Sequence, residues 1–223
     1  ALRELESAEQ GLLFMSGQGK ITLRSRQDFM TTTRCITPAV TFGDTGTDVP
    51  YTAISVDGNQ IDFVRNLVSV SYPGGNVTVK DATSITAYST QSDSVNANAM
   101  PSSASWLARQ LANFRLRVRK DPAVRVPAIT VKPRVSMATC YPVAALELGD
   151  RVLVNRNPTG GTGSIAAKCT VQGVDHHITD DDWTIDLTLS PAAKSYTEAP
   201  YLIAGGSSSA SYVGVASGNL VPF

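Results

Sequence analysis

The sequence predicts a mainly β protein with one or two helices, an α+β fold. Short apolar runs alternate with polar residues along most of the chain, and turns rich in glycine, proline and asparagine separate them. Only one segment, at about 102–116, has the apolar spacing of an amphipathic helix of several turns. Charged residues make up 17% of the chain, below the roughly 25% usual for soluble domains. Small polar residues replace them and favour strands and turns over long helices.

The first half of the chain contains the clearest local signals. Residues 2–10 have weak helical periodicity, and Gly11 is expected to end this helix. Two β-hairpins with glycine in their turns are predicted: 12–15 with 20–24, and 67–72 with 76–80.

Two further helices are predicted after the second hairpin. Asp81 is expected to cap a short helix that ends at Tyr88. The longer helix follows Pro101, with Ser102 or Ser103 as its N-cap. Its apolar positions indicate one face that packs on a sheet: Trp106, Leu107, Leu111 and Phe114.

A basic segment begins at Arg115, where the pattern changes to a period of two. Arg115, Arg117 and Arg119 alternate with apolar residues, which predicts a strand with its arginines on one side. Nucleic-acid-binding stripes usually include aromatic residues for stacking, and this stretch has none after Phe114. We therefore expect a solvated strand, or one that faces a partner or the lumen of an assembly.

These patterns divide the chain into three parts. Residues 1–120 form a β-rich domain with the amphipathic helix, and residues 121–194 form a small β-barrel or sandwich of closely spaced strands. Residues 195–223 are rich in Gly, Ser and Ala and are expected to form an extended arm. Five apolar side chains in this arm are the predicted contacts between subunits: Tyr201, Leu202, Ile203, Tyr212 and Val213.

A search for catalytic and metal-binding motifs finds none, so the chain is predicted not to be an enzyme. His176 and His177 are adjacent in a predicted strand and therefore point to opposite faces. The glycine-rich loop 158–163 lacks the Gly-Lys-Ser/Thr ending of a phosphate-binding loop. The spacing of Asp180-Asp181-Asp182 does not match a calcium loop. No catalytic, cofactor-binding or metal-ligating residue is assigned.

Composition also limits the class of partner. The chain has 19 basic and 19 acidic residues, so it has no overall preference for nucleic acid or membrane. No apolar run approaches the roughly 18 residues of a membrane helix. The three cysteines match neither a disulfide framework nor a metal site, and we expect reduced, buried thiols.

Three segments of the chain, taken in order, resemble a known family of proteins. They are Leu148-Gly149-Asp150-Arg151-Val152, then residues 171–178, then 183–191, and they are similar to minor tail and hub-like proteins of siphophages that infect actinobacteria. The same order of elements continues upstream, with 9–14 before a glycine hairpin, 66–72 before Pro73-Gly74-Gly75, and the helix at Trp106-Leu107-Ala108.

The resemblance implies a tail-tip or baseplate hub built from tube-type β-barrel or sandwich domains. Such a subunit is expected to form a homotrimer that links the sixfold tail tube to the tip and provides the channel for the genome. It would be made in the host cytoplasm, reside in the virion and contact the distal tail protein, the tape measure protein and tip or fibre proteins. DNA would meet it only in transit. Hubs of this type are usually longer, with further sequence before the position of Ala1.

Three other readings remain open. A sixfold distal tail ring protein would differ in copy number. A receptor- or carbohydrate-binding β-module would need surface aromatic residues in a groove, and the chain has only two tryptophans. A polysaccharide or peptidoglycan hydrolase would need paired carboxylates, and Asp175, Asp180 and Asp186 offer no convincing pair.

Overall fold

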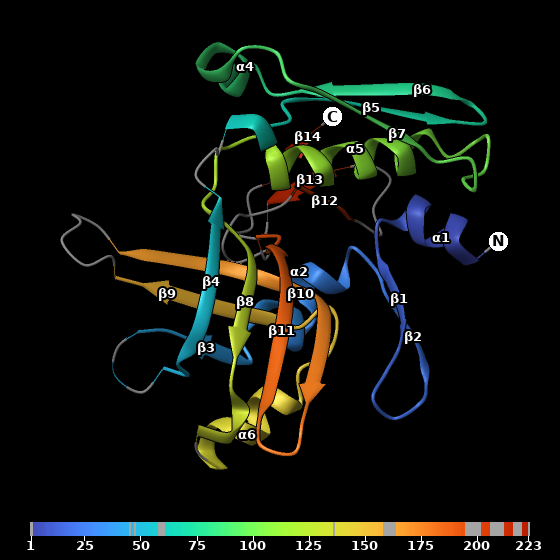
Figure 1. Ribbon diagram of the computed structural model, residues 1–223. Coiled ribbons are helices and arrows are strands. Elements are labelled where there is room, and N and C mark those ends of the chain that lie inside the picture. Colours follow the sequence, from blue (N-terminus) through green and yellow to red (C-terminus); the bar gives the residue numbers. More distant parts are fainter. Residues whose placement is uncertain are drawn as a thin grey trace.

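The computed structural model describes residues 2–44, 46, 48–57, 61–135, 137–157 and 164–194, together with the backbone of three short C-terminal strands. Within these ranges the chain is mainly β with six α-helices, in agreement with the predicted α+β class. Figure 1 shows a curled sheet below, a smaller sheet with its helix above, and a separate N-terminal hairpin to one side.

The larger sheet has six strands and curls into a half-barrel. In order across the sheet they are β3 (Val40–Phe42), β9 (Arg151–Arg156), β10 (Ile165–Ile178), β11 (Trp183–Pro191), β8 (Arg125–Val131) and β4 (Tyr51–Asp57). Only the β3–β9 pair is parallel. A bridge between Phe42 and Val49, just before β4, brings the two edges of the sheet toward each other.

The interior of the curled sheet contains the larger hydrophobic core. Alternate residues of the strands point inward, and the largest fully buried side chains include Phe42, Ile129, Ile185 and Leu187. Strand β10 changes register between Val171 and Gly173, and this β-bulge bends the strand so that it can take part in two pairings.

The smaller sheet lies above and packs on one helix. Its strands are β6 (Gly75–Lys80), β5 (Leu67–Tyr72) and β7 (Ser92–Asn96), in that order, with the short helix α4 (Ala82–Tyr88) between β6 and β7. Helix α5 (Ser105–Arg119) lies on the face turned toward the larger sheet (Figure 1). The core between them buries Val68, Val70 and Val95 against Ala108 and Leu111.

The N-terminal region contains short elements. They are α1 (Leu2–Glu9), β1 (Leu12–Met15), β2 (Ile21–Arg24), α2 (Asp28–Thr31) and α3 (Thr33–Ile36). Strands β1 and β2 form a two-stranded hairpin that no third strand joins within the described residues. A further helix, α6 (Met137–Ala144), and two short 3-10 turns, η1 (Ile61–Phe63) and η2 (Pro133–Val135), complete the described part.

Several sequence predictions are confirmed. Both glycine hairpins form, and the first helix ends at Glu9 before Gln10 adopts a left-handed φ of 53°. Asp81 caps α4, since its carboxylate accepts a hydrogen bond from the Ser84 N–H. The long helix is confirmed too, but it begins at Ser105, and Ala104 at its N-cap makes no side-chain hydrogen bond.

The predicted basic strand at Arg115–Arg119 is wrong. These residues form the last turn of α5, which continues to Arg119 instead of ending near 116. Leu116 continues a buried stripe with Ala108 and Ala112 at a spacing of four, so it packs on the small sheet only if the chain stays helical. Basic and apolar residues that alternate over five positions are compatible with a strand or with a helix. The packing of Leu116 on the small sheet selects the helix.

Strands from distant parts of the sequence share the six-stranded sheet. β3 and β4 come from before residue 120 and β8–β11 from after it, so the sheet includes both sides of the predicted boundary. The C-terminal segment, predicted as an extended arm, contains three short strands: β12 (Leu202–Gly205), β13 (Tyr212–Val215) and β14 (Leu220–Pro222). They pair with one another as a small antiparallel sheet.

Candidate functional site

The hairpin β1–β2 has two unlike faces. Cross-strand partners Leu12 and Arg24, and Phe14 and Thr22, share one face because side chains alternate along a strand. This inner face turns toward the body of the protein, where Leu12 packs beside the buried Phe29 and Cys35. The Arg24 guanidinium lies 5.4 Å from the centre of the Phe14 ring, within the range of a cation–π contact.

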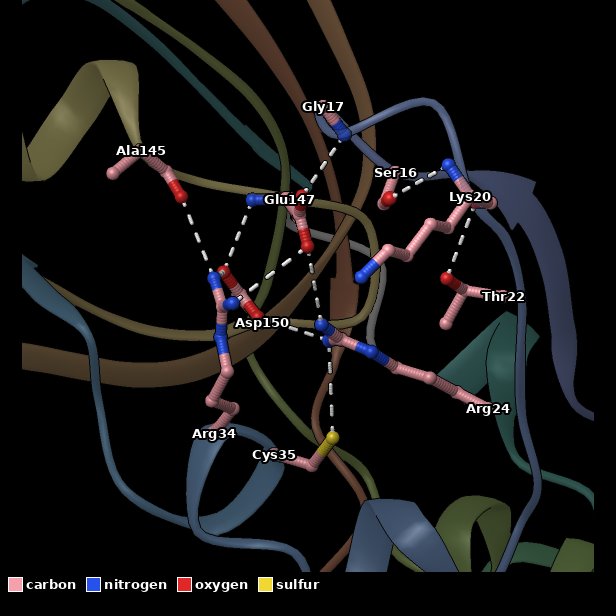
Figure 2. A network of polar contacts seen from close by, with 10 residues as sticks. All are labelled: Ser16, Gly17, Lys20, Thr22, Arg24, Arg34, Cys35, Ala145, Glu147 and Asp150. Carbon is pink, nitrogen blue, oxygen red and sulfur yellow. Dashed lines mark hydrogen bonds and ion pairs between the residues drawn. The ribbon is translucent and has the colours of Figure 1, made fainter.

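Asp150 is buried and lies at the centre of an ion-pair network that holds this inner face (Figure 2). Its side chain has no exposure to solvent. Arg24 Nη1 donates to Asp150 Oδ1 at 2.9 Å, and Arg34 Nη2 donates to Asp150 Oδ2 at 2.6 Å. The Glu147 N–H donates to the same Oδ2 at 3.0 Å. One carboxylate thus joins the hairpin, α3 and the turn before β9.

Glu147 adds a second acid to the network. Its Oε1 accepts a hydrogen bond from the Gly17 N–H in the turn of the hairpin, and its Oε2 lies 3.8 Å from Arg24 and 3.6 Å from Arg34. Two arginines therefore face two carboxylates, so the charges balance. A buried charge without such partners would be strongly unfavourable.

The turn that positions Asp150 depends on Gly149. Its φ is +83°, which glycine adopts without strain, and a Cβ here would lie 2.8 Å from Arg24 Cδ. The Gly149 N–H donates to Val171 O and the Val171 N–H donates to Asp150 O, so the turn is fixed to β10. The network consequently rests on the six-stranded sheet.

The network can hold the hairpin in place, because its charged groups already have partners. Both Asp150 oxygens already accept hydrogen bonds from cationic or main-chain donors. The hydrogen bond from Arg34 to Asp150 raises the pKa of that arginine. Burial raises the pKa of the nearby Cys35 thiol, which disfavours the thiolate needed for nucleophilic attack. The arrangement fixes the hairpin and supplies no free acid, base or nucleophile.

Arg151, next to Asp150, also connects separate elements, through hydrogen bonds on the other side of the strand. Its side chain is fully buried, and its Nη1 donates to Ile36 O at 2.7 Å, at the end of α3. Its Nη2 lies 3.5 Å from Ala193 O, beyond β11. Consecutive residues Asp150 and Arg151 thus connect α3 to the start of β9 and to the segment that follows β11.

The predicted basic residues have internal partners. Arg115 Nη1 and Arg119 Nη1 lie 3.2 and 3.6 Å from Asp93 Oδ2 on β7. Burial lowers the pKa of Arg115, and Asp93 partly offsets this effect. Arg117 lines a surface hollow beside Val118. Arg115 and Arg119 therefore attach α5 to the small sheet.

The predicted arm contacts are located only in part. Leu202 and Ile203 belong to β12, and Tyr212 and Val213 belong to β13. The placement of their side chains, and of Tyr201 as a whole, lies outside the described residues. Their role as subunit contacts stays a prediction.

The histidine and aspartate motifs have local partners. His176 Nδ1 accepts from the Trp183 indole N–H at 3.2 Å, whereas His177 Nε2 lies 3.2 Å from Asp186. Asp182 pairs with Lys132 at 2.7 Å. Across the described ranges, no group of three His, Cys, Asp or Glu residues is placed to hold a metal ion, and no helix there is long and apolar enough to span a membrane.

Comparison with solved structures gives the main relation to known proteins. No family model matches the sequence, and no curated protein matches it significantly. The fold matches that of a tail protein from Neisseria meningitidis MC58, with a TM-score of 0.53 and 16% identity over 89% of this chain and 55% of that one. It also matches the 43 kDa tail protein of prophage MuSo2 from Shewanella oneidensis, with a TM-score of 0.50 and 11% identity over 86% of this chain and 52% of that one.

The chain has the fold of these phage tail proteins. It spans about half the length of the two solved structures. At these identities the likeness concerns the fold.

The ion-pair network was not predicted, although its residues lie in motifs that the sequence made visible. Gly149 and Asp150 belong to the segment that carried the family resemblance, and Arg24 ends a predicted strand. Arg24 and Asp150 are 126 residues apart, so their pairing has no local signal. The sequence signal near the site was limited to Gly149-Asp150 directly before an apolar strand.

Proposed function

We propose that this chain is a structural subunit of a bacteriophage tail, and specifically of the tail-tip hub. The observation that carries the proposal is the fold match, over 89% and 86% of the chain, to two tail proteins. The proposal includes a homotrimeric ring between the tail tube and the tip, with other tail proteins as neighbours and the genome passing through. It also states that the chain is not an enzyme.

The side-chain chemistry supports a structural role. The charged groups that are most buried, Asp150 and Arg151, are used to hold elements together. Two hollows border the C-terminal half of α5, of about 140 and 340 Å³, and neither lining contains a pair of carboxylates. The siphophage and actinobacterial origin stays a prediction from the C-terminal sequence pattern.

Cryo-electron microscopy of the phage particle tests the proposal directly. We expect three copies around the tail axis, between the tube and the tip. Six copies would support a distal tail ring instead, and copies on peripheral fibres would support receptor binding. Absence of the chain from purified particles would refute a structural role in the tail.

A further inference from the structure

We propose that the end of the β10–β11 hairpin is a pH-sensitive element, held through its core face at neutral pH and through its solvent face in mild acid. The hairpin end consists of residues 177–184, which lie beyond Ile185, the last residue of β11 that pairs with β8. It is found at the lower end of the larger sheet in Figure 1. This property belongs to the isolated chain and is independent of the proposed hub function.

Trp183 and His176 join the hairpin end to the rest of the sheet on the core face. The Trp183 indole N–H donates to His176 Nδ1 at 3.2 Å, and the two ring centroids lie 5.9 Å apart at an angle of 30°. His176 is the cross-strand partner of the buried Ile185, which places both rings on this face. An indole nitrogen can only donate, so this hydrogen bond exists only while His176 Nδ1 carries no proton.

His177 and Asp186 join the same two parts on the solvent face. His177 Nε2 lies 3.2 Å from Asp186 Oδ2, and Asp186 is fixed in turn by a hydrogen bond from the Thr130 hydroxyl of β8. Both nitrogens of a protonated imidazole donate. Protonation of His177 therefore makes this contact an ion pair with a charge-assisted hydrogen bond, which is stronger than a neutral one.

Protonation thus acts in opposite directions on two adjacent histidines. Falling pH removes the acceptor for Trp183 at His176 and adds a positive charge beside Asp186 at His177. Histidine changes charge between about pH 5 and 8, so both changes fall in one interval. The core-face contact contributes stability above this interval and is lost as the pH falls through it. The solvent-face ion pair is gained over the same interval.

The other charged groups around the hairpin end belong to residue types that ordinarily change charge outside this interval. Lys132 Nζ donates to Asp182 Oδ2 at 2.7 Å, and this hydrogen bond lowers the pKa of Asp182, so the pair persists in mild acid. The chain has two histidines, and both lie here. In the described part of the chain, the charged neighbours of the hairpin end are Lys132, Arg134, Asp175, Asp180, Asp181, Asp182 and Asp186.

Tryptophan fluorescence tests the core-face contact. The chain has two tryptophans, so Trp106→Phe leaves Trp183 as the only indole. In this background we expect the Trp183 emission to change with one transition between about pH 8 and 5. His176→Gln should abolish the transition, whereas the neighbouring His177→Gln should retain it. Far-UV circular dichroism confirms that all variants fold. A transition that persists in His176→Gln, or none in the Trp106→Phe background, would overturn the proposal.

Amide hydrogen exchange tests whether the hairpin end loosens. The Thr179 N–H donates to Asp182 O at 2.8 Å in the turn, and the Val171 N–H of the same hairpin donates to Asp150 O at 2.9 Å. Protection factors correct for the direct effect of pH on exchange. Between about pH 8 and 5, we expect that of Thr179 to fall about twofold to tenfold, the effect of one hydrogen bond. That of Val171 should stay constant, as should that of Thr179 in His176→Gln. An equal fall at Thr179 and Val171, or none at Thr179, would contradict local loosening.

The variant His177→Gln tests the solvent face. It cannot form the ion pair with Asp186, so its Thr179 amide should be less protected than that of the wild type at about pH 5 and similar at about pH 8. Equal protection at the lower pH would show that the solvent face does not hold the hairpin end. Because these measurements use the chain alone, their failure would leave the hub function standing.

Discussion

At the scale of single residues, Asp150 combines complete burial with two arginine partners. Replacing both partners of a buried ion pair by apolar residues often changes stability little. Removing only one partner is strongly destabilising, because the other charge stays buried without a partner. In this protein the remaining charges would be Arg24, whose side chain is 11% exposed, and the half-exposed Arg34. Arg24 is therefore the group that makes loss of Asp150 unfavourable.

We predict that Asp150→Asn lowers the free energy of unfolding by about 3–5 kcal/mol. The amide keeps the shape of the side chain but removes the negative charge that both arginines contact. Urea unfolding monitored by circular dichroism measures the effect. Asp182→Asn is the matched control, since its pair with Lys132 lies at the surface, and it should change stability little. Equal stability of the two variants would show that the network is not a clamp.

At the scale of elements, α4 is held by its N-cap. The Asp81 carboxylate accepts from the Ser84 N–H at 2.9 Å and from Lys120 Nζ, just after α5, at 2.9 Å. These hydrogen bonds, first that from Lys120 and then that from Ser84, lower the pKa of Asp81 below its ordinary value of 3.8. Asp81 thus caps the start of α4 and connects it to the end of α5.

We predict that Asp81→Ala lowers the free energy of unfolding by about 1 kcal/mol at neutral pH. Because the pKa is lower in the folded protein, the charge of Asp81 contributes its full stability above pH 3.8 and loses it as the pH falls through the folded value. The difference between wild type and variant should therefore be constant from pH 7 to 5 and shrink below pH 4. Thermal unfolding at each pH measures it. A difference that grows on acidification would contradict the assigned shift.

Elements were predictable where neighbours in the sequence determine them. The two hairpins, α1 and α4 follow from glycine turns and one capping aspartate. The last turn of α5 and the whole of α6 were not predicted. Arg115–Arg119 suits a strand by itself and becomes helical because Leu116 packs on the small sheet. Helix α6 contains Pro142 and little amphipathic pattern, so no local signal marks it.

At the scale of the whole molecule, what could not be predicted is how distant segments meet. β3 pairs with β9 and β4 with β8, and Arg24 reaches Asp150 across 126 residues. Local periodicity carries no information about such pairings, which depend on the packing of one common core. The class of fold was predicted correctly, since most of the strands carry a local alternating pattern.

We predict that deleting residues 195–223 weakens assembly and leaves the folded core intact. The two larger sheets and the Asp150 network are formed by residues before 195, and β12–β14 pair only with one another within the described residues. Sedimentation velocity measures assembly, and thermal unfolding measures the core. An unchanged oligomer would show that the contacts between subunits do not need these residues: Leu202, Ile203, Tyr212 and Val213.

The interleaved order of strands has a consequence for how the chain folds as it is synthesised. The small sheet and α5 come from one continuous segment, 67–119, so they can form while the ribosome is still adding residues. β4 ends at Asp57, but its partner β8 begins at Arg125. At roughly 5–20 residues per second, β4 waits several seconds for that partner. During this interval β4 lacks the strand that supplies its main-chain hydrogen bonds in the folded sheet.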